Sequence, residues 1–388
     1  MESSVYLFPW NLADEGVEPV LAAIGERAGC AGVSVAFNYH TAKFLHPRPH
    51  PHFHFAGEAT AYFRPQFDRY RHTPIKPIAH PSVKERDVLG EAREAARRVG
   101  LRFHAWIVCL HSTLLGTSHP DAVVRTAYGD PLPFALSPSH PDVREYIKEL
   151  ALDVALGYEP DALELESLEY VPVAHGYHHE LDGVRLSLFD QALLGADFSP
   201  YAQQDLSNRG VDVEHCMSVV RRRLDDVFSA SRPMPPHDEP ELHEFFVART
   251  AIVTDLVAEI ASAVTRQTKA QVDVLLSPWQ RSPEELWLEG HDPSALARHA
   301  QRLVAPAFYA EPAAITHHFT TLARELGHLE DVTAVLLAMP PFAESRQQLC
   351  DAVDAVRECG IERVSFYNYG FIRADVLDWI HDATRRNS

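Results

Sequence analysis

The sequence predicts an α/β protein, a single (β/α)8 TIM barrel formed by the whole chain, residues 1–388. Short β-rich segments alternate with amphipathic helical segments, which favours parallel strands joined by right-handed crossovers. Eight such units occur, and a closed barrel explains eight units better than an open sheet does. No GxGxxG motif follows the first strand and no GxxxxGK[ST] motif occurs, so a nucleotide-binding sheet loses its main support.

The expected strands are short runs rich in Val, Ile, Leu, Phe and Tyr, as buried parallel strands are. We expect them at 5–8, 32–37, 101–108, 162–165, 271–276, 303–308, 332–338 and 363–367.

The segments after these strands carry apolar residues at helical spacing. We expect helices within 15–28, 82–99, 141–156, 239–266, 294–302, 312–326, 343–359 and 373–384. Gly100 directly follows the segment 82–99 and suits the left-handed residue that often ends a helix.

Two connections are far longer than the usual loop between a strand and its helix. The first, residues 38–81, follows the second strand and is rich in His, Pro, Phe and Tyr. The second, residues 167–238, follows the fourth strand and contains a helical pattern at 211–229. Both follow the C-terminal ends of strands, where barrel enzymes build their active sites. We therefore expect them to form walls of a pocket within one domain.

The charge balance restricts the class of partner. Lys and Arg number 35 against 54 Asp and Glu, so the net charge is −19. Such a surface repels phosphate backbones and anionic lipids. We expect a neutral small-molecule or oligosaccharide substrate, and neither nucleic acid nor a membrane as partner. A homo-oligomer is compatible with the sequence, which leaves the oligomeric state open.

The five cysteines are scattered without a CxxC pair, as in a protein of a reducing compartment. The N-terminal segment lacks the basic and apolar regions of a signal peptide, and no apolar run reaches about 18 residues. The expected location is cytoplasmic.

The fourth strand carries two glutamates on one face. Strand side chains alternate, so Leu163 and Leu165 point out while Glu164 and Glu166 point into the barrel. Burying unpaired carboxylates is costly, so an inward pair has either a catalytic role or a polar partner in the barrel. Glu166, at the C-terminal end of the strand, is the first catalytic candidate. The deeper Glu164 suits a buried ion pair equally well.

Several motifs between residues 85 and 170 resemble the glycosyl-hydrolase-like TIM-barrel family. They are AREAARRVGLRFHAW at 92–106, HPD at 119–121, GD at 129–130, LSPSHPDVREYI at 136–147 and YEPDALELE at 158–166. The resemblance covers under a quarter of the chain and implies a glycoside hydrolase. It also places Glu166 at the family's strand-four Asp, the catalytic carboxylate. Ala162 in place of a family Gly, and Ser167 in place of a second acid, depart from that pattern.

Glycoside hydrolysis usually needs a second carboxyl group. Glu311 follows the sixth strand at the barrel's C-terminal face, although an acid before Pro312 also suits a helix N-terminus. Glu164 is the other candidate, because residues two apart on a strand are roughly 6.6 Å apart at Cα. Glu169, in the loop after strand four, is a weaker option.

Aromatic, amide and imidazole side chains gather at the expected strand ends. Rings cover the apolar faces of sugars while amides and imidazoles bind hydroxyl groups. The expected substrate-binding residues are Trp10, Asn38, His40, Trp106, His111, Trp279, Tyr367 and Asn368.

The 23 histidines include two local clusters, His46/His50/His52/His54 and the segment HGYHHE at 175–180. His175 and His179 have the spacing of helical ligands, but the HExxH order of zinc peptidases and an HxH motif on strand one are both absent. We expect no metal and no cofactor.

The leading hypothesis is therefore a glycoside hydrolase that acts on a neutral carbohydrate through carboxylates at the C-terminal face. One alternative is a metal-dependent sugar isomerase or epimerase with Glu166 and histidines such as His40 as ligands. The other is a barrel that binds carbohydrate without catalysis.

Overall fold

The protein forms a closed barrel of eight parallel strands, which confirms the predicted fold class. The computed structural model describes residues 1–48, 51–56, 60–175, 180, 182–229, 239–277 and 282–386. The barrel strands are β1 (Glu2–Leu7), β2 (Gly32–Ala36), β7 (Arg102–Val108), β10 (Ala162–Glu166), β11 (Gln271–Leu275), β12 (Arg302–Pro306), β13 (Val332–Leu337) and β14 (Arg363–Tyr367). Neighbouring strands follow the chain order and β14 pairs with β1 to close the barrel.

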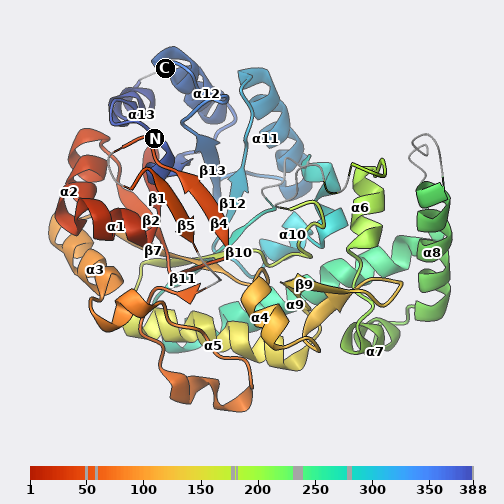
Figure 1. Ribbon diagram of the computed structural model, residues 1–388. Helices are drawn as coiled ribbons and strands as arrows, with labels where there is room; N and C mark the ends of the chain where they lie inside the picture. Colours follow the sequence, from red (N-terminus) through yellow and green to blue (C-terminus); the bar gives the residue numbers. More distant parts are fainter. Residues whose placement is uncertain are drawn as a thin grey trace.

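Helices surround the strands, as Figure 1 shows, and α6, α7 and α8 lie to one side of the barrel. The α-helices are α1 (Pro9–Glu15), α2 (Val17–Ala22), α3 (Val88–Val99), α4 (Thr113–Ser118), α5 (Pro141–Tyr158), α6 (Leu188–Leu194), α7 (Pro200–Asn208), α8 (Val213–Ser229), α9 (His243–Gln267), α10 (Pro293–Leu296), α11 (Pro312–Leu326), α12 (Arg346–Glu358) and α13 (Val376–Arg385). A π-helical turn, Ala23–Arg27, extends α2, and 3-10 helices span Phe67–His72, Pro81–Lys84, Pro240–Leu242, Pro283–Glu289 and Tyr369–Phe371.

Several helical segments differ from the expectation: 15–28 is α2 followed by the π-helical turn, 239–266 is a 3-10 helix followed by α9, and 82–99 and 294–302 differ as follows. The segment 82–99 divides into the 3-10 helix Pro81–Lys84 and α3, because the Asp87 side chain accepts a hydrogen bond from the Gly90 backbone and starts a new helix there. In the segment 294–302 only α10 is helical, and it ends at Leu296. By contrast, α11 has the expected bounds, with Pro312 in its first turn and Gly327 in the left-handed conformation at its end.

The long connections contain secondary structure of their own. After β2, β3 (Asn38–Tyr39) pairs antiparallel with β6 (Thr60–Ala61), and β4 (Ala42–Leu45) pairs with β5 (Phe53–Ala56). After β7, β8 (Val123–Arg125) and β9 (Pro131–Leu136) form a third antiparallel pair, which the sequence analysis did not predict.

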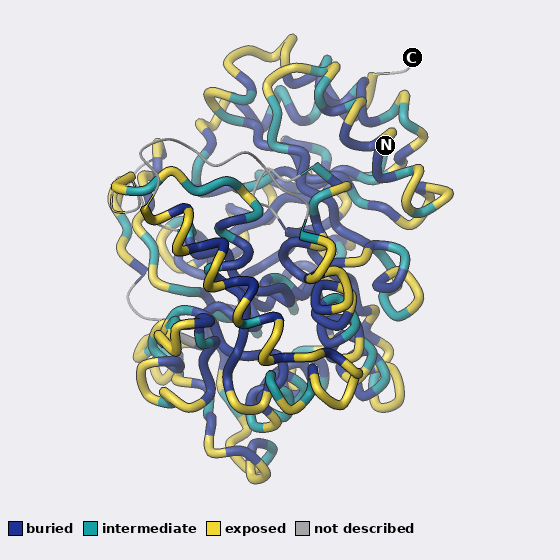
Figure 2. The backbone as a smooth tube through the Cα atoms, turned by 90° about the vertical axis from the view of Figure 1, so that its right-hand side faces the viewer, coloured by how far each residue is buried: buried dark blue, intermediate teal, exposed yellow. Residues whose placement is uncertain are grey.

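The buried side chains form one large core and a smaller one. The large core joins the strands to the helices around them, and in Figure 2 the buried backbone runs through the interior while exposed segments lie outside. The smaller core joins α6 and α8 to the first half of α9 through residues such as Leu193, Val220 and Phe245. The second half of α9, from Leu256 to Val264, belongs to the large core. No helix among the described residues combines the length and apolar character needed to cross a membrane.

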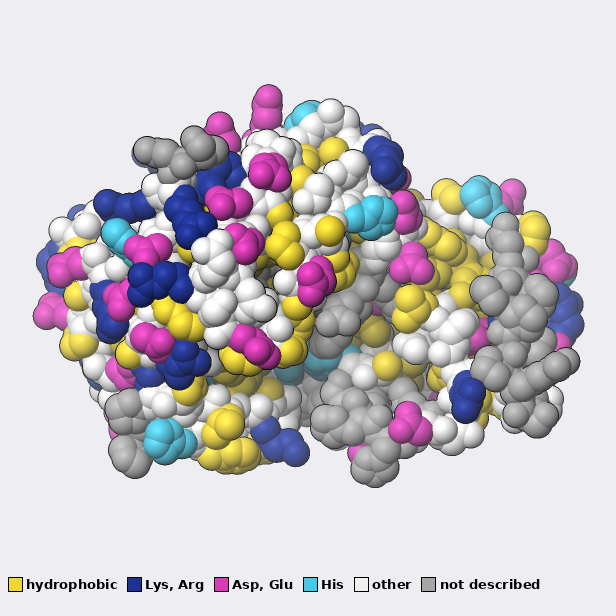
Figure 3. All heavy atoms as spheres, turned by 90° about the horizontal axis from the view of Figure 1, so that it is seen from above, with side chains coloured by type: hydrophobic (Ala, Val, Ile, Leu, Met, Phe, Trp, Pro, Cys, Tyr) yellow, Lys and Arg dark blue, Asp and Glu magenta, His cyan; other side chains and the backbone are white. Residues whose placement is uncertain are grey.

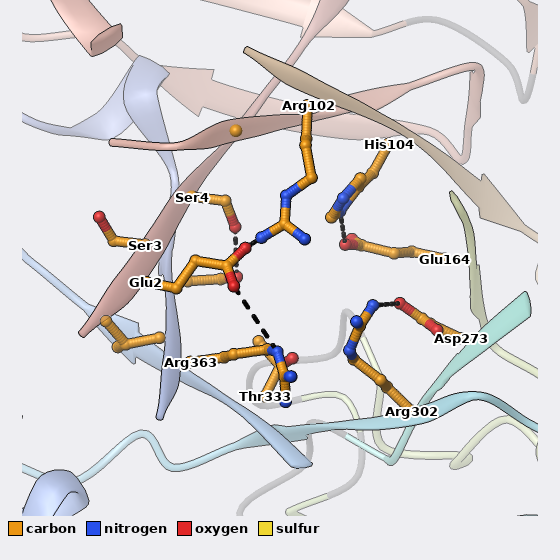
Figure 4. Close-up of a pocket in the computed structure, with 13 residues that line it drawn as sticks. Glu2, Ser3, Ser4, Arg102, His104, Glu164, Asp273, Arg302, Thr333 and Arg363 are labelled. Carbon is orange, nitrogen blue, oxygen red and sulfur yellow. Dashed lines mark hydrogen bonds and ion pairs between the residues drawn. The ribbon is translucent and has the colours of Figure 1, made fainter. Parts of the chain in front are cut away.

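The N-terminal half of the barrel interior is polar, although barrel interiors are usually filled by branched apolar side chains. Figure 4 shows its charged side chains pointing toward one another from different strands. The pairs are Glu2 with Arg102 and Arg363, His104 with Glu164, and Arg302 with Asp273. Opposite charges are therefore paired in the N-terminal half of the barrel, and these ion pairs fill it in place of apolar side chains.

The outer surface carries charges of both signs. On the face seen in Figure 3, basic side chains are interspersed with acidic ones.

Candidate active site

A pocket of about 440 Å³ opens at the C-terminal end of the barrel, and Glu166 is its carboxylate. The volume is typical of small-molecule sites. The walls are mainly aromatic and aliphatic; the lining residues are Tyr6, Tyr39, His40, Ala42, Phe44, Trp106, Glu166, His175, Leu275, Pro306, Phe308, Val335 and Tyr367.

Glu166 is the last residue of β10, and its side chain is only partly exposed in this pocket. Its carboxylate accepts a hydrogen bond from the indole Nε1–H of Trp106 on the neighbouring strand β7. Burial raises the pKa of Glu166 to about 7, while the bond from Trp106 acts in the opposite direction. Near neutral pH the group therefore exchanges a proton readily, as a general acid or base must.

Three tyrosines, Tyr6, Tyr39 and Tyr367, line the pocket together with this carboxylate. The hydroxyl groups of Tyr39 and Tyr367 are 3.1 Å apart, and the ring of Tyr6 meets the ring of Trp106 edge to face at 5.3 Å. Burial and the charge of Glu166 raise the pKa of Tyr367 above its usual range, so its hydroxyl stays protonated. The pocket thus offers neutral hydroxyl donors and aromatic faces around one carboxyl group.

Glu164 lies one layer below, inside the polar half of the barrel. Its Oε1 accepts hydrogen bonds from Ser34 at 2.9 Å and from His104 at 2.8 Å. Burial favours protonation of Glu164, but these bonds outweigh it and hold its pKa below the usual range. The structure therefore places Glu164 in an ion pair and does not bring it into the pocket.

The other carboxyl candidates lie in two different settings. Glu311 is exposed at the N-terminal end of α11 and is not among the described residues that line the pocket. Glu169 is buried, and burial together with the charges of Glu289 and Glu166 raises its pKa well above the usual range. Like Glu311, Glu169 is not among the described residues that line the pocket, and its Oε2 lies 3.7 Å from Nε2 of the buried His291.

Among the described residues, four of the expected substrate-binding residues do not line the pocket: Trp10, Asn38, His111 and Asn368. Trp10 is buried against Phe8 and donates to His46, and Asn368 is buried where its side chain caps the turn at Gly370. Asn38 is turned toward the backbone of β7 and hydrogen-bonds both the N–H and the carbonyl group of Val108. Trp279 lies outside the described residues.

The histidines group differently from the clusters seen in the sequence. His46 binds Trp10 and the Gly370 carbonyl, and His54 stacks on Trp10, so these two pack the second connection against the barrel. His50, His178 and His179 lie outside the described residues.

A triad of His40, His111 and His175 forms at the pocket instead. His40 and His111 were expected to bind substrate, and His175 was assigned to a separate segment. The grouping could have been anticipated from the barrel order, because each histidine follows one of three adjacent strands.

Comparisons with known proteins identify relatives by fold. No family model and no curated protein matches the sequence. Among solved structures, α-L-fucosidase isoenzyme 2 from Paenibacillus thiaminolyticus matches with a TM-score of 0.58 and 13% identity, over 99% of this chain and 49% of that one. A β-galactosidase from the psychrophilic Marinomonas ef1 matches with a TM-score of 0.61 and 9% identity, over 99% and 59%. The C-terminal domain of a putative chitinase from Desulfitobacterium hafniense matches with a TM-score of 0.53 and 9% identity, over 99% of both chains.

At sequence identities of 13%, 9% and 9%, these matches establish the barrel fold and do not establish the activity. The chain spans 49% of the fucosidase and 59% of the galactosidase.

Proposed function

We propose that the protein is a glycoside hydrolase of a neutral carbohydrate, with Glu166 as the group that transfers the proton to the leaving oxygen. The observation that carries this proposal is the carboxyl group of Glu166, the one carboxyl group among the described residues that line the aromatic pocket at the C-terminal end of the barrel, with a pKa raised to about 7. The names of the three structural neighbours, a fucosidase, a galactosidase and a putative chitinase, agree with it.

The protonation state of Glu166 supports the role of an acid. A general acid works best when its pKa is close to the ambient pH, because it is then protonated and still gives up the proton. Trp106 donates to the same carboxylate and stabilises the charge left after proton transfer. Glu166 is therefore protonated before the transfer, and Trp106 stabilises its carboxylate after the transfer.

The pocket walls support a carbohydrate as substrate. Trp106, Tyr39 and Tyr367 present ring surfaces that suit the C–H faces of a sugar, and the tyrosine hydroxyl groups suit its oxygens. No Lys or Arg lines the pocket among the described residues, so a neutral sugar suits it better than a phosphorylated one.

We assign the second carboxyl group to Glu169, ahead of the sequence candidates Glu311 and Glu164. Glu169 is buried on the connection directly after β10, three residues beyond Glu166, whereas Glu311 is exposed and Glu164 is held in an ion pair. Glycoside hydrolysis usually needs such a second carboxyl group beside the acid.

The test is hydrolysis of a panel of aryl glycosides and oligosaccharides by the wild type and four Glu→Gln variants. Glu166→Gln should lower kcat by about 10²- to 10⁴-fold, the usual contribution of a general acid or base. Glu169→Gln should also lower kcat and change its pH profile. Glu311→Gln is the matched surface control, and Glu164→Gln tests the lower ion pair.

Unchanged turnover in Glu166→Gln contradicts the assignment of the acid. Saturable binding of a glycan to the wild type without turnover of any substrate contradicts hydrolysis and supports a carbohydrate-binding barrel.

A further inference from the structure

Three histidines from neighbouring connections meet at the rim of the Glu166 pocket. His40 comes after β2 and β3, His111 comes after β7, and His175 comes after β10. One ring nitrogen of each lies within 4.8 Å of the corresponding nitrogens of the other two. We propose that His40, His111 and His175 bind one divalent transition-metal ion, for which Zn²⁺ is the best match.

The backbone holds two of these residues in place before any ion binds. Asn38 joins the connection after β2 to the end of β7, since its side chain bonds the Val108 N–H at 2.9 Å and its carbonyl group at 2.6 Å. His111 pairs with Ala135 in an antiparallel bridge next to β9. A metal site needs ligands of fixed position, and these contacts fix His40 and His111 side by side.

The hydrogen bond of the His40 ring leaves a nitrogen that can bind a metal. Nδ1 of His40 lies 3.0 Å from the Thr41 carbonyl oxygen, so Nδ1 carries the hydrogen and Nε2 keeps its lone pair. A bond from the second ring nitrogen to a carbonyl group is the usual support of a metal-binding histidine.

The spacing requires only side-chain adjustment. Zn–N bonds of about 2.0–2.1 Å in a tetrahedral site put the nitrogens about 3.4 Å apart, so nitrogens that now lie within 4.8 Å of one another must approach by up to about 1.4 Å. The His175 ring is nearly perpendicular to those of His40 and His111, at 79° and 76°, while the latter two stack at 22°. We expect rotation of one stacked ring about its side-chain bonds on metal binding, because two stacked imidazoles do not direct their nitrogens at one ion.

The donor set selects the ion. Neutral imidazoles favour zinc and the later transition metals, whereas Mg²⁺ and Ca²⁺ prefer oxygen ligands. The net charge of −19 also favours accumulation of cations near the surface.

The site faces the pocket, because His40 and His175 line it together with Glu166. A metal held by three protein ligands keeps a coordination position for another donor. We expect that position to bind a hydroxyl oxygen of the carbohydrate; this part rests on the proposed function, whereas metal binding does not.

The experiment is calorimetric titration of the chelator-treated full chain with ZnCl₂, with MgCl₂ as comparison. We expect one Zn²⁺ per chain, no comparable Mg²⁺ binding and a zinc-dependent rise in Tm. His40→Ala and His111→Ala should each weaken Zn²⁺ binding by at least about 100-fold, since even an outer partner of a metal-binding histidine contributes about 10- to 100-fold. His317→Ala, on the exposed face of α11, is the matched control and should bind as the wild type does.

Absence of stoichiometric Zn²⁺ binding by the wild type overturns the proposal, as does unchanged affinity in His40→Ala. His40 is only partly buried, so its variant tests the site even if the variant of the buried His111 does not fold. A wild type that binds Zn²⁺ but hydrolyses no glycoside supports the metal site and contradicts the proposed function. Glycoside turnover by a chain that binds no Zn²⁺ supports the proposed function and overturns the metal site.

Discussion

The hydrogen bond from Trp106 to Glu166 can be tested by replacing the indole with a ring that has no donor. The charged carboxylate accepts this bond, and the bond lowers the pKa of Glu166 from the value that burial alone would produce. In Trp106→Phe the charged form loses its donor while the protonated form loses little. The pKa of Glu166 should therefore rise further above about 7.

The size of the effect follows from the strength of such a bond. A hydrogen bond to a charged group contributes about 1.5–3 kcal/mol, and about 1.4 kcal/mol corresponds to a tenfold change in an equilibrium constant. The variant should thus bind a proton at Glu166 about tenfold more tightly or more. In activity, the limb of the pH profile that reports Glu166 should move to higher pH.

The direct assay is a carbon-13 NMR titration of protein labelled at the glutamate carboxyl carbon, with the signal of Glu166 identified by its loss in Glu166→Gln. Tyr39→Phe is the matched control: Tyr39 lines the same pocket, but its hydroxyl group pairs with Tyr367. A pKa of Glu166 that stays the same or falls in Trp106→Phe refutes the reasoning, provided that the variant keeps a cooperative thermal transition.

Three further predictions follow from burial and charge. Glu166→Gln should stabilise the fold by about 2–3 kcal/mol above neutral pH and not below about pH 4, because the unfolded carboxyl group ionises from its ordinary pKa of 4.5 upward while the folded one holds its proton up to about 7, so the penalty builds up between these two values. Equal stabilities at both pH values in denaturant titrations would contradict this. His104→Ala should lower the free energy of unfolding by about 3–5 kcal/mol, since it leaves Glu164 as a buried charge without its partner; a loss below about 1 kcal/mol, the range of exposed pairs, would argue against the ion pair. Glu311→Gln should change the free energy of unfolding by no more than about 0.5 kcal/mol, as exposed substitutions usually do, and should leave kcat unchanged. A large loss of kcat would instead show that Glu311 takes part in catalysis.

The barrel could be predicted because its signals are local. Strand bounds agree with the expectation to within a few residues, since each strand is a short apolar run between polar turns. The inward direction of Glu164 and Glu166 follows from alternation alone and is confirmed by their partners on β2 and β7. The division of segment 82–99 was missed because it depends on the Asp87 side chain competing for the backbone at Gly90.

The site was harder to predict because it depends on contacts between connections. Alternation gave Glu166 its place, but it could not show that Glu164 would be held by His104 or that Asn38 would bind Val108. Spacing along the chain pointed to histidine clusters within single segments. The triad of His40, His111 and His175 combines three segments, and only strand adjacency in the closed barrel brings them together.

The helix α9 has a mechanical consequence for the whole molecule. Its first half, around Phe245 and Ile252, lies in the smaller core, and its second half, around Ile260, lies in the large one. Because one continuous helix packs in both cores, unfolding of one core removes packing from the other. Amide hydrogen exchange should therefore show similar protection along the whole of α9. The smaller core, with α6 and α8, should unfold together with the barrel as a single cooperative unit.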